Sequence, residues 1–477
     1  DLHSFPTRRS SDLLNFRTML GRLRNLTTFP KRPDVIAFLI FSSVFLVLAL
    51  LESKHLLSKE DYFVAGRKAS SLQVGFSVIA SCVGASATIG MCGLAFSVGF
   101  PAIWWLLSGA IGLSILNIFL LKKLRRRPCL TMLETVKERL GGRATKLCAF
   151  IIVLAWVAIL AAQFSAMSSI VEQMTGSDAQ TSLFLGAFVI LLYTLIGGQA
   201  TVIKSDVIQL SVMMIGLAVL LFALIHASPQ PLSAFRFELL NDQFQTQDLS
   251  RFALLIGGSY VVCPMLFSRF MSARSDEVAH KGAMIAIVGL IFLAILFVLI
   301  GIQARDFLPS STPSDQVLAA VAAQLPLIFQ QILFLILISA ILSSADSCLL
   351  TAATVVSNDL IRNPSIKTSR LVMCVLTLVA LLLSSSERGI LDLLLMANNM
   401  YVCAVIAPVF AAVFSSRLLN RPIIITTIIL CGLIAFWAEW TGHFELTLMA
   451  FVLSVIGTSA AAYFEPMRSS RGVCQKS

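Results

Sequence analysis

The chain has 477 residues, of which 57% are hydrophobic and only 13% are charged. Soluble domains carry about 25% charged residues, so this composition excludes an ordinary soluble enzyme or binding domain. The net charge of +11 would suit a nucleic-acid binder, but the basic residues are concentrated in short loops between apolar runs. That distribution is typical of membrane-protein topology.

The two ends of the chain are expected to lie outside the folded core. The run from His3 to Leu13 looks like a translated sequencing adapter. We therefore expect residues 1–13 to be an assembly artefact, which has no place in fold reasoning. Residues 14–33 are expected to form an N-terminal tail, and residues 464–477 a cytoplasmic tail.

Apolar runs of about 18 or more residues alternate with short polar loops, and each run is long enough to cross a bilayer as a helix. The pattern predicts an all-α protein with about thirteen spans. One extra span is predicted at 34–52, and two C-terminal spans lie within 416–463, at 420–438 and 444–463. The ten spans of the core, residues 53–415, are predicted at 71–92, 98–121, 144–172, 178–196, 203–226, 253–268, 281–303, 326–356, 371–385 and 389–415. A short loop helix is predicted from Thr131 to Leu140.

The basic residues predict the orientation of these spans. Of the 36 Lys and Arg residues, 25 lie in loops that alternate spans place on one side of the membrane. Seven more lie in the N-terminal tail. The four in the opposite loops are Arg236, Arg251, Arg305 and Arg388. The positive-inside rule then places the N-terminus outside and the C-terminus inside the cell.

Two of the predicted spans are interrupted at mid-depth. The second has small and hydroxyl residues from Ala80 to Gly90, and the seventh contains Gly257, Gly258 and Pro264. Small residues alone often serve helix packing. These interruptions lie five spans apart, however, as do the discontinuous helices that line the central site of transporters with inverted repeats. The pair therefore indicates a binding site.

Polar side chains within the spans suggest the chemistry of that site. Ala340, Ser343 and Ser344 share one helix face, although the serines could instead bond to carbonyls of their own helix. Carboxylates within spans are costly and usually functional. Asp206 could act in transport, cap its helix or pair with Lys204. Asp346 could balance the charge of an ion, cap a polar network or hold a proton.

Five motifs in order resemble the sodium:solute symporter family. They are Asp61 to Arg67, Thr131 to Gly141, Gly197 to Gln209, Arg269 to Gly282 in the loop after the sixth core helix, and Ser343 to Arg362. The resemblance covers roughly residues 58–415. It implies a LeuT-type fold with two inverted five-helix repeats, at about 71–226 and 253–415, with one extra span before them and two after.

The resemblance implies a sodium site between the first and eighth core helices. Its ligands would be the carbonyls of Ala80, Val83 and Ala340 and the hydroxyls of Ser343 and Ser344. By the same resemblance, Asp206 would serve the exit path or a second cation, and Asp346 is the other candidate for the second cation. Some relatives carry Asp or Asn at the position of Cys82, and Ser at the position of Gly84. These departures leave proton-coupled or uncoupled transport open.

The solute site is expected between the two broken helices and the third, eighth and tenth core helices. Acidic and amide residues that sugar-transporting relatives place on the first two core helices are absent, which argues against a hexose. A small solute is favoured, and a carboxylate on it could bind helix N-termini. The candidate residues are Ser86, Ala87, Trp105, Gln163, Tyr260, Cys263, Asn398 and Asn399.

The sequence therefore predicts a secondary active transporter of the bacterial inner membrane that couples sodium to a small organic solute by alternating access. It contains no catalytic constellation, so an enzyme is not expected, and sodium is a co-substrate with no other cofactor. The expected partners are the solute, sodium and the lipid bilayer, without nucleic acid, in a monomer or weak oligomer. The alternatives are a proton-coupled or uncoupled transporter of the same fold and a transporter-like sensor.

Overall fold

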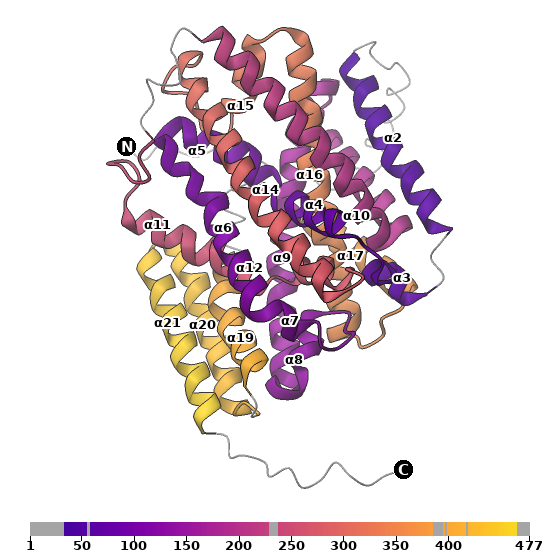
Figure 1. Ribbon diagram of the computed structural model, residues 1–477, viewed down its shortest axis with the longest axis vertical. Helices are drawn as coiled ribbons and strands as arrows, with labels where there is room; N and C mark the ends of the chain where they lie inside the picture. The colour runs from indigo at the N-terminus through magenta and orange to yellow at the C-terminus, as the bar shows by residue number, and fades with distance from the viewer. Residues whose placement is uncertain are drawn as a thin grey trace, which may run out of the picture.

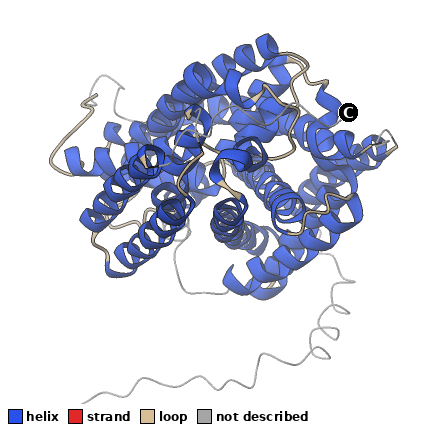
Figure 2. Cartoon of the chain, turned by 90° about the horizontal axis from the view of Figure 1, so that it is seen from below, coloured by secondary structure: helices blue, strands red, loops and turns tan. Residues whose placement is uncertain are grey.

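A computed structural model describes residues 33–54, 58–228, 237–384, 395, 398–415 and 418–464. The predicted artefact at 1–13, nearly all of the N-terminal tail, the C-terminal tail and Arg388 lie outside these residues. Within the described residues every regular element is a helix, as Figure 2 shows. The all-α prediction is confirmed for this part of the chain.

The helices run through the chain with few long loops (Figure 1). In order they are α2 (Pro33–Ser53), α3 (Lys59–Val64), α4 (Ser71–Cys82), α5 (Met91–Val98), α6 (Trp104–Ile115), α7 (Leu121–Leu124), α8 (Met132–Leu140), α9 (Gly142–Thr175), α10 (Ala179–Ala227), α11 (Thr246–Phe252), α12 (Gly258–Val261), α13 (Pro264–Met271), α14 (Asp276–Gln303), α15 (Val317–Gln324), α16 (Leu327–Val355), α17 (Ile366–Ser384), α19 (Ala407–Phe414), α20 (Arg421–Thr441) and α21 (Phe444–Tyr463). Several are continued by π-helical turns, namely η4 (Ser86–Gly90), η6 (Leu116–Leu120), η8 (Ala253–Gly257), η10 (Val356–Leu360) and η11 (Val402–Ile406).

Nine helices of the described residues are long and apolar enough to cross a membrane, or ten if one bent pair counts as a span. The predicted spans 178–196 and 203–226 both lie in α10, which is sharply kinked at Gly198. Gly198 has φ 58°, and a Cβ there would lie 2.7 Å from the Tyr62 ring, so only glycine fits this turn. Two further apolar helices, Leu39–Ser53 and Asn398–Phe414, are shorter.

Both spans predicted to be interrupted are broken. Val83 ends α4 with φ −108° and ψ 77°, and the chain bends by 68° before the helix resumes. Val262 ends α12 with φ −132° and ψ 54°, and α13 begins at Pro264. Proline has no N–H to continue the helix. Irregular backbone at this depth is tolerated where it lines a site.

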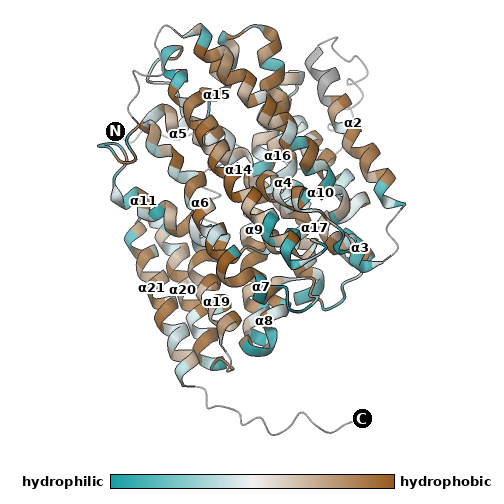
Figure 3. Ribbon diagram, in the orientation of Figure 1, coloured by the Kyte–Doolittle hydropathy of each residue, from teal (hydrophilic) through white to brown (hydrophobic). Residues whose placement is uncertain are grey.

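Helices α9, α10 and α16 form the centre of the packing, with α4 and α2 against α10. The C-terminal pair α20 and α21 packs at one side against α19 and η11 (Figure 1). Brown, apolar residues predominate along α14 and α21, while teal, polar residues gather around α3, α7 and α8 (Figure 3). Exposed apolar side chains such as Leu433 and Ile456 suit contact with lipid tails.

Candidate functional site

Four of the five residues predicted to bind sodium converge where the end of α4 meets α16. The Ser343 hydroxyl donates to the Ala80 and Ala340 carbonyl oxygens, at 3.0 Å each. The Ser344 hydroxyl lies 3.5 Å from the Ala80 oxygen and 3.2 Å from the Ser81 oxygen. All five residues are buried. Because hydroxyl hydrogens rotate, these oxygens can turn their lone pairs toward a cation.

Val83, the fifth predicted sodium ligand, lies at the break itself. Its N–H donates to the Ile79 and Ala80 carbonyls at 3.1 and 3.3 Å, which closes the last turn of α4. The described contacts do not include the Val83 carbonyl oxygen, so its role as a ligand stays a prediction. The Ser81 carbonyl, in contrast, joins the site without having been predicted.

A fully buried guanidinium lies next to this site. Arg269 of α13 donates to Gln199 Oε1 at 2.9 Å and to the Ser81 hydroxyl at 3.2 Å. It also donates to the Ser347 hydroxyl, and its Nη2 lies 3.7 Å from Asp206 Oδ2. A buried charge needs such partners, because removal from water is costly. Arg269 therefore organises a polar network between α4, α10 and α16.

Both predicted acids belong to this network. Asp206 Oδ2 accepts a hydrogen bond from the Ser77 hydroxyl at 2.5 Å, and Asp206 Oδ1 has no partner among the described residues. Asp346 accepts from the Tyr193 hydroxyl at 2.7 Å and from the Ser347 hydroxyl at 3.0 Å. With two carboxylates and one guanidinium, the ionised network has one excess negative charge, which a cation or a proton would balance.

Two assignments made from the sequence are wrong. Asp206 does not pair with Lys204, since the Lys204 ammonium contacts Glu52 at 2.5 Å on the surface. Arg269 does not lie in a cytoplasmic loop, because α13 extends to Met271 and leaves no Arg269 surface exposed. Arg269 stands at the end of an apolar run. The residues around it in the sequence do not reveal whether such an arginine lies in a loop or is buried beside an aspartate from a distant part of the chain.

A central cavity of about 80 Å³ lies beside the sodium site and shares Ser81 and Ser344 with it. None of the described residues that line it is Asp, Glu, Lys, Arg or His. The solute would therefore meet only neutral groups. The lining residues are Ser81, Cys82, Gly84, Ser86, Trp105, Trp156, Ile159, Gln163, Ile256, Ser259, Tyr260, Cys263, Met265, Ser344, Cys348 and Asn398.

Most of the predicted solute-binding residues line this cavity, namely Ser86, Trp105, Gln163, Tyr260, Cys263 and Asn398. The structure places Ala87 and Asn399 elsewhere. Ala87 is buried away from the cavity, and Asn399 donates to Glu439 and Thr447 of the C-terminal helices. Successive residues of a helix point about 100° apart, and here Asn398 lines the cavity while Asn399 faces the C-terminal helices.

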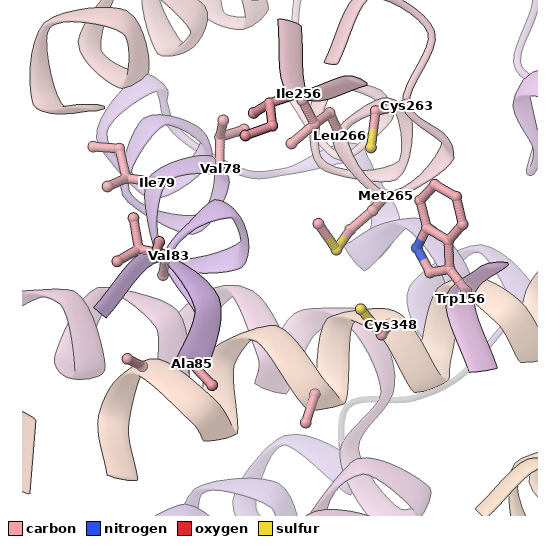
Figure 4. Close-up of a cluster of buried hydrophobic side chains, with 14 of the residues drawn as sticks. Val78, Ile79, Val83, Ala85, Trp156, Ile256, Cys263, Met265, Leu266 and Cys348 are labelled. Atoms are coloured by element: carbon pink, nitrogen blue, oxygen red, sulfur yellow. The ribbon is translucent and has the colours of Figure 1, made fainter. Parts of the chain in front are cut away.

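Several cavity residues were missed, and Trp156 is the most informative. Figure 4 shows Trp156, Cys263, Met265 and Cys348 around a common space, with the indole nitrogen turned toward Met265. Trp156 precedes Gln163 by two helical turns, so the two share a face of α9. That spacing was the available signal. The cysteines gave none, because buried cysteine usually behaves as a small apolar residue.

Trp156 and Gln163 direct hydrogen-bond donors at the cavity region. The Trp156 ring packs edge-on against Tyr401, and its Nε1 has no partner among the described residues. Gln163 Oε1 accepts the Ala85 N–H at 3.0 Å, which fixes the amide with its NH₂ group pointing the other way. The Ala85 N–H, at the start of the second half-helix, therefore already donates to Gln163 and is not available to a solute.

Gly84 is required by the close approach of these groups. A Cβ at this position would lie 2.6 Å from Ser344 Oγ and 2.8 Å from Gln163 Nε2. Real Cβ atoms do not come so near other heavy atoms, so the serine carried by some relatives has no room here. The glycine found here therefore matches the space that Ser344 and Gln163 leave at this position.

Two arginines hold the predicted cytoplasmic side together, and we call them the cytoplasmic clamp. Arg125 contacts Asp276 at 2.7 Å and donates to the Ala273 carbonyl at 3.2 Å. Arg67 donates to the Met271 carbonyl at 3.2 Å. Partial burial lowers the pKa of Arg67, although an arginine remains charged at neutral pH. The clamp thus joins the loops before α4 and after α7 to the end of α13.

The chain resembles known transporters in sequence. The sodium/glucose cotransporter of Vibrio parahaemolyticus is 25% identical over 375 residues, 69% of this chain and 68% of that protein. The sodium/pantothenate symporter of Haemophilus influenzae is 25% identical over 323 residues, 63% of this chain and 66% of that protein. The human high affinity choline transporter 1 is 26% identical over 328 residues, 63% of this chain and 56% of that protein. The aligned part of the chain thus spans about two thirds or less of these relatives.

Solved structures share the fold. A Na⁺-coupled sialic acid symporter, in a substrate-bound outward-open state, has a TM-score of 0.77 at 15% identity and covers 90% of this chain and 97% of its own. MhsT in complex with L-phenylalanine has a TM-score of 0.56 at 15% identity and covers 83% and 99%. The predicted LeuT-type fold is confirmed. The family model for sodium:solute symporters matches residues 62–429. The chain belongs to the sodium:solute symporter family, and sodium-coupled transport of a solute across a membrane follows from that membership.

Proposed function

We propose that this protein takes up a small carboxylate-bearing solute across the bacterial inner membrane, with sodium as co-substrate and no other cofactor. The observation that carries the proposal is the meeting of the Ala80 and Ala340 carbonyls with the Ser343 and Ser344 hydroxyls at the break of α4. A sodium ion that has lost its water needs several such oxygens. One inward charge contributes about 2.3 kcal/mol per 100 mV of membrane potential.

The position of the sodium site explains how the ion and the solute are coupled. Ser344 belongs both to the sodium site and to the wall of the cavity, and Gly84 lies between Ser344 and Gln163. Sodium held at Ser344 would fix the local backbone and the Gln163 amide before the solute arrives. Coupling of this kind is a free energy shared by two ligands.

The neutral cavity favours a solute with hydrogen-bond acceptors. Trp156 Nε1 has no acceptor within the part of the chain that the structure describes, and the Gln163 amide turns its NH₂ group away from Ala85. A buried donor without a partner costs about 1–3 kcal/mol, which a carboxylate or carbonyl oxygen of the solute would recover. Side-chain donors, rather than the helix N-termini expected from the sequence, would then recognise the solute.

The buried charge network supports Asp206 and Asp346 as a second cation position. Asp206 Oδ1 accepts no hydrogen bond from any described residue, and this oxygen and the excess negative charge of the network both favour a second positive charge there. A proton would meet the same demand, so proton coupling at Asp206 is the alternative. An Asp206→Asn variant would keep the shape and remove that charge.

Purified protein in liposomes tests the proposed function. Radiolabelled proline, pantothenate, choline and glucose would be offered with an inward sodium gradient, an inward proton gradient or neither. Sodium-driven accumulation of proline or pantothenate supports the proposal. Accumulation driven by the proton gradient alone contradicts sodium coupling. Sodium-driven accumulation of choline or glucose, without accumulation of proline or pantothenate, contradicts the proposal that the solute carries a carboxylate.

A further inference from the structure

The C-terminal helices meet the transport core at one polar cluster. Glu439, near the end of α20, accepts a hydrogen bond from Asn399 Nδ2 at 3.1 Å through its Oε2. Its other oxygen, Oε1, lies 3.5 Å from Arg251 Nη2 of α11. Asn399 also donates to the Thr447 hydroxyl of α21 at 3.0 Å. A single carboxylate thus connects α11, α20 and the helix that begins at Asn398.

The cluster lies at the outer membrane interface in the predicted topology. Trp437 and Trp440 on the same helix are 59% and 61% exposed, and exposed tryptophans gather at membrane interfaces. The Glu439 side chain is only 17% exposed, and Asn399 is fully buried. A carboxylate within a span is costly to hold and is usually functional.

The two partners of Glu439 belong to two different helices of the cavity wall. Arg251 lies in the last turn of α11, and the broken helix continues from there through η8 and α12 to Tyr260, which lines the cavity. Asn399 directly follows Asn398, which lines it from another helix. Glu439 therefore contacts both helices through Arg251 and Asn399, and it is not itself one of the residues that line the cavity.

We propose that Glu439 is a positioning residue, whose carboxylate holds the outer half of the broken helix, α11 to α12, against the helix at Asn398. This contact sets how readily the cavity opens to the outside, and it rests on the proposed function by alternating access. The Arg251 guanidinium is also placed 5.7 Å from the Phe444 ring of α21. With its charge removed, Glu439 would still accept from Asn399 but would release Arg251.

Three native thiols report cavity opening without knowledge of the solute. Cys82, Cys263 and Cys348 all line the cavity. Right-side-out vesicles would be treated with a membrane-impermeant maleimide, and the modification of each thiol would be followed by mass spectrometry. Glu439→Gln is expected to raise the rate at these thiols at least threefold, while Glu445→Gln, an exposed acid at the start of α21, leaves it unchanged.

Further variants separate positioning from folding. Arg251→Gln should raise the rate as much as Glu439→Gln, the double variant no more than either, and Glu439→Asp should restore part of the wild-type rate. Rates in Glu439→Gln equal to those of Glu445→Gln, or strictly additive effects in the double variant, overturn the proposal. Absence of sodium-dependent uptake by the wild-type protein would overturn the proposed function instead. The role of Glu439 in cavity opening would still be supported in that case if the rate of thiol modification depended on Glu439.

Discussion

A cation that enters a lipid-embedded site must exchange its water for protein oxygens. Ala80 and Ala340 supply carbonyl dipoles, and Ser343 and Ser344 supply hydroxyls, so the site offers several oxygens without a formal charge. Formal charges lie in the adjoining network of Arg269, which shares Ser81 with the site. Because the carbonyl and hydroxyl ligands are neutral, sodium is not held as a fully paired ion and can leave again.

Replacement of Gly84 tests how tightly these groups are packed. In Gly84→Ala the new Cβ would press on Ser344 and Gln163, and we expect uptake to be lost while the protein still reaches the membrane. The matched control is Gly90→Ala, six residues later at the end of η4, where a Cβ meets nothing within 4 Å. Sodium-dependent uptake and membrane abundance would be measured together. Normal uptake by Gly84→Ala would show that the close packing at the break is not needed.

Replacement of Arg269 tests the buried network. Arg269→Met leaves Asp206 and Asp346 buried without their cation, and loss of one partner of a buried pair costs about 3–5 kcal/mol. We expect a lower midpoint of thermal unfolding in detergent, followed by tryptophan fluorescence. The control is Arg274→Met, an exposed arginine in the same segment. Equal midpoints for the two variants would mean that Arg269 carries no such charge compensation.

Helix periodicity placed Ser343 and Ser344 on one helix face, and the family resemblance assigned them to a sodium site with Ala80, but neither predicted the Ser81 carbonyl that joins them. The i, i+1 pair on α16 faces the break of α4 because both positions lie near one stripe of the helix. The same reasoning failed at Asn399, since only the packing of α20 decides which member of a neighbouring pair faces inward. Arg269 was missed because its partners Gln199 and Ser347 lie some 70 residues or more away.

At the scale of helices, the breaks are the features that local sequence predicts best. Pro264 cannot continue a helix, and the residues from Ala80 to Gly84 contribute little side-chain packing to maintain one. The kink at Gly198 was predicted only as a short loop between spans. Its tightness depends on the contact with Tyr62, a residue far away in the chain.

The cytoplasmic clamp gives a prediction at this scale. Arg125→Ala removes contacts to Asp276 and to the backbone after α13, so we expect the cytoplasmic side to open more often. In inside-out vesicles, impermeant maleimide should modify Cys348 several-fold faster than in the wild type. Arg126→Ala, the exposed neighbour, serves as the control. A rate equal to that of the control would show that Arg125 does not keep this side closed.

Across the whole molecule, composition and charge distribution were enough to predict a polytopic helical protein and its orientation. The family resemblance then implied the LeuT-type fold with its inverted repeat, and the structural comparison confirms that fold. The chemistry of the solute could not be predicted, because the cavity residues come from at least five helices and none is charged. The role of the C-terminal pair was equally hidden, since Glu439 meets Arg251 and Asn399 only in the folded protein.

The central claim is that sodium binds between the break of α4 and α16, and the sodium dependence of uptake by Ser343→Ala tests it most directly. Ser339→Ala is the control, since Ser339 is one turn earlier, is buried and bonds only to Leu335 of its own helix. Loss of a hydrogen-bonding group to a charged ligand costs about 1.5–3 kcal/mol, so the sodium concentration for half-maximal uptake should rise about tenfold or more in Ser343→Ala. It should stay unchanged in Ser339→Ala. An unchanged sodium requirement in both variants, with uptake intact, would contradict the site.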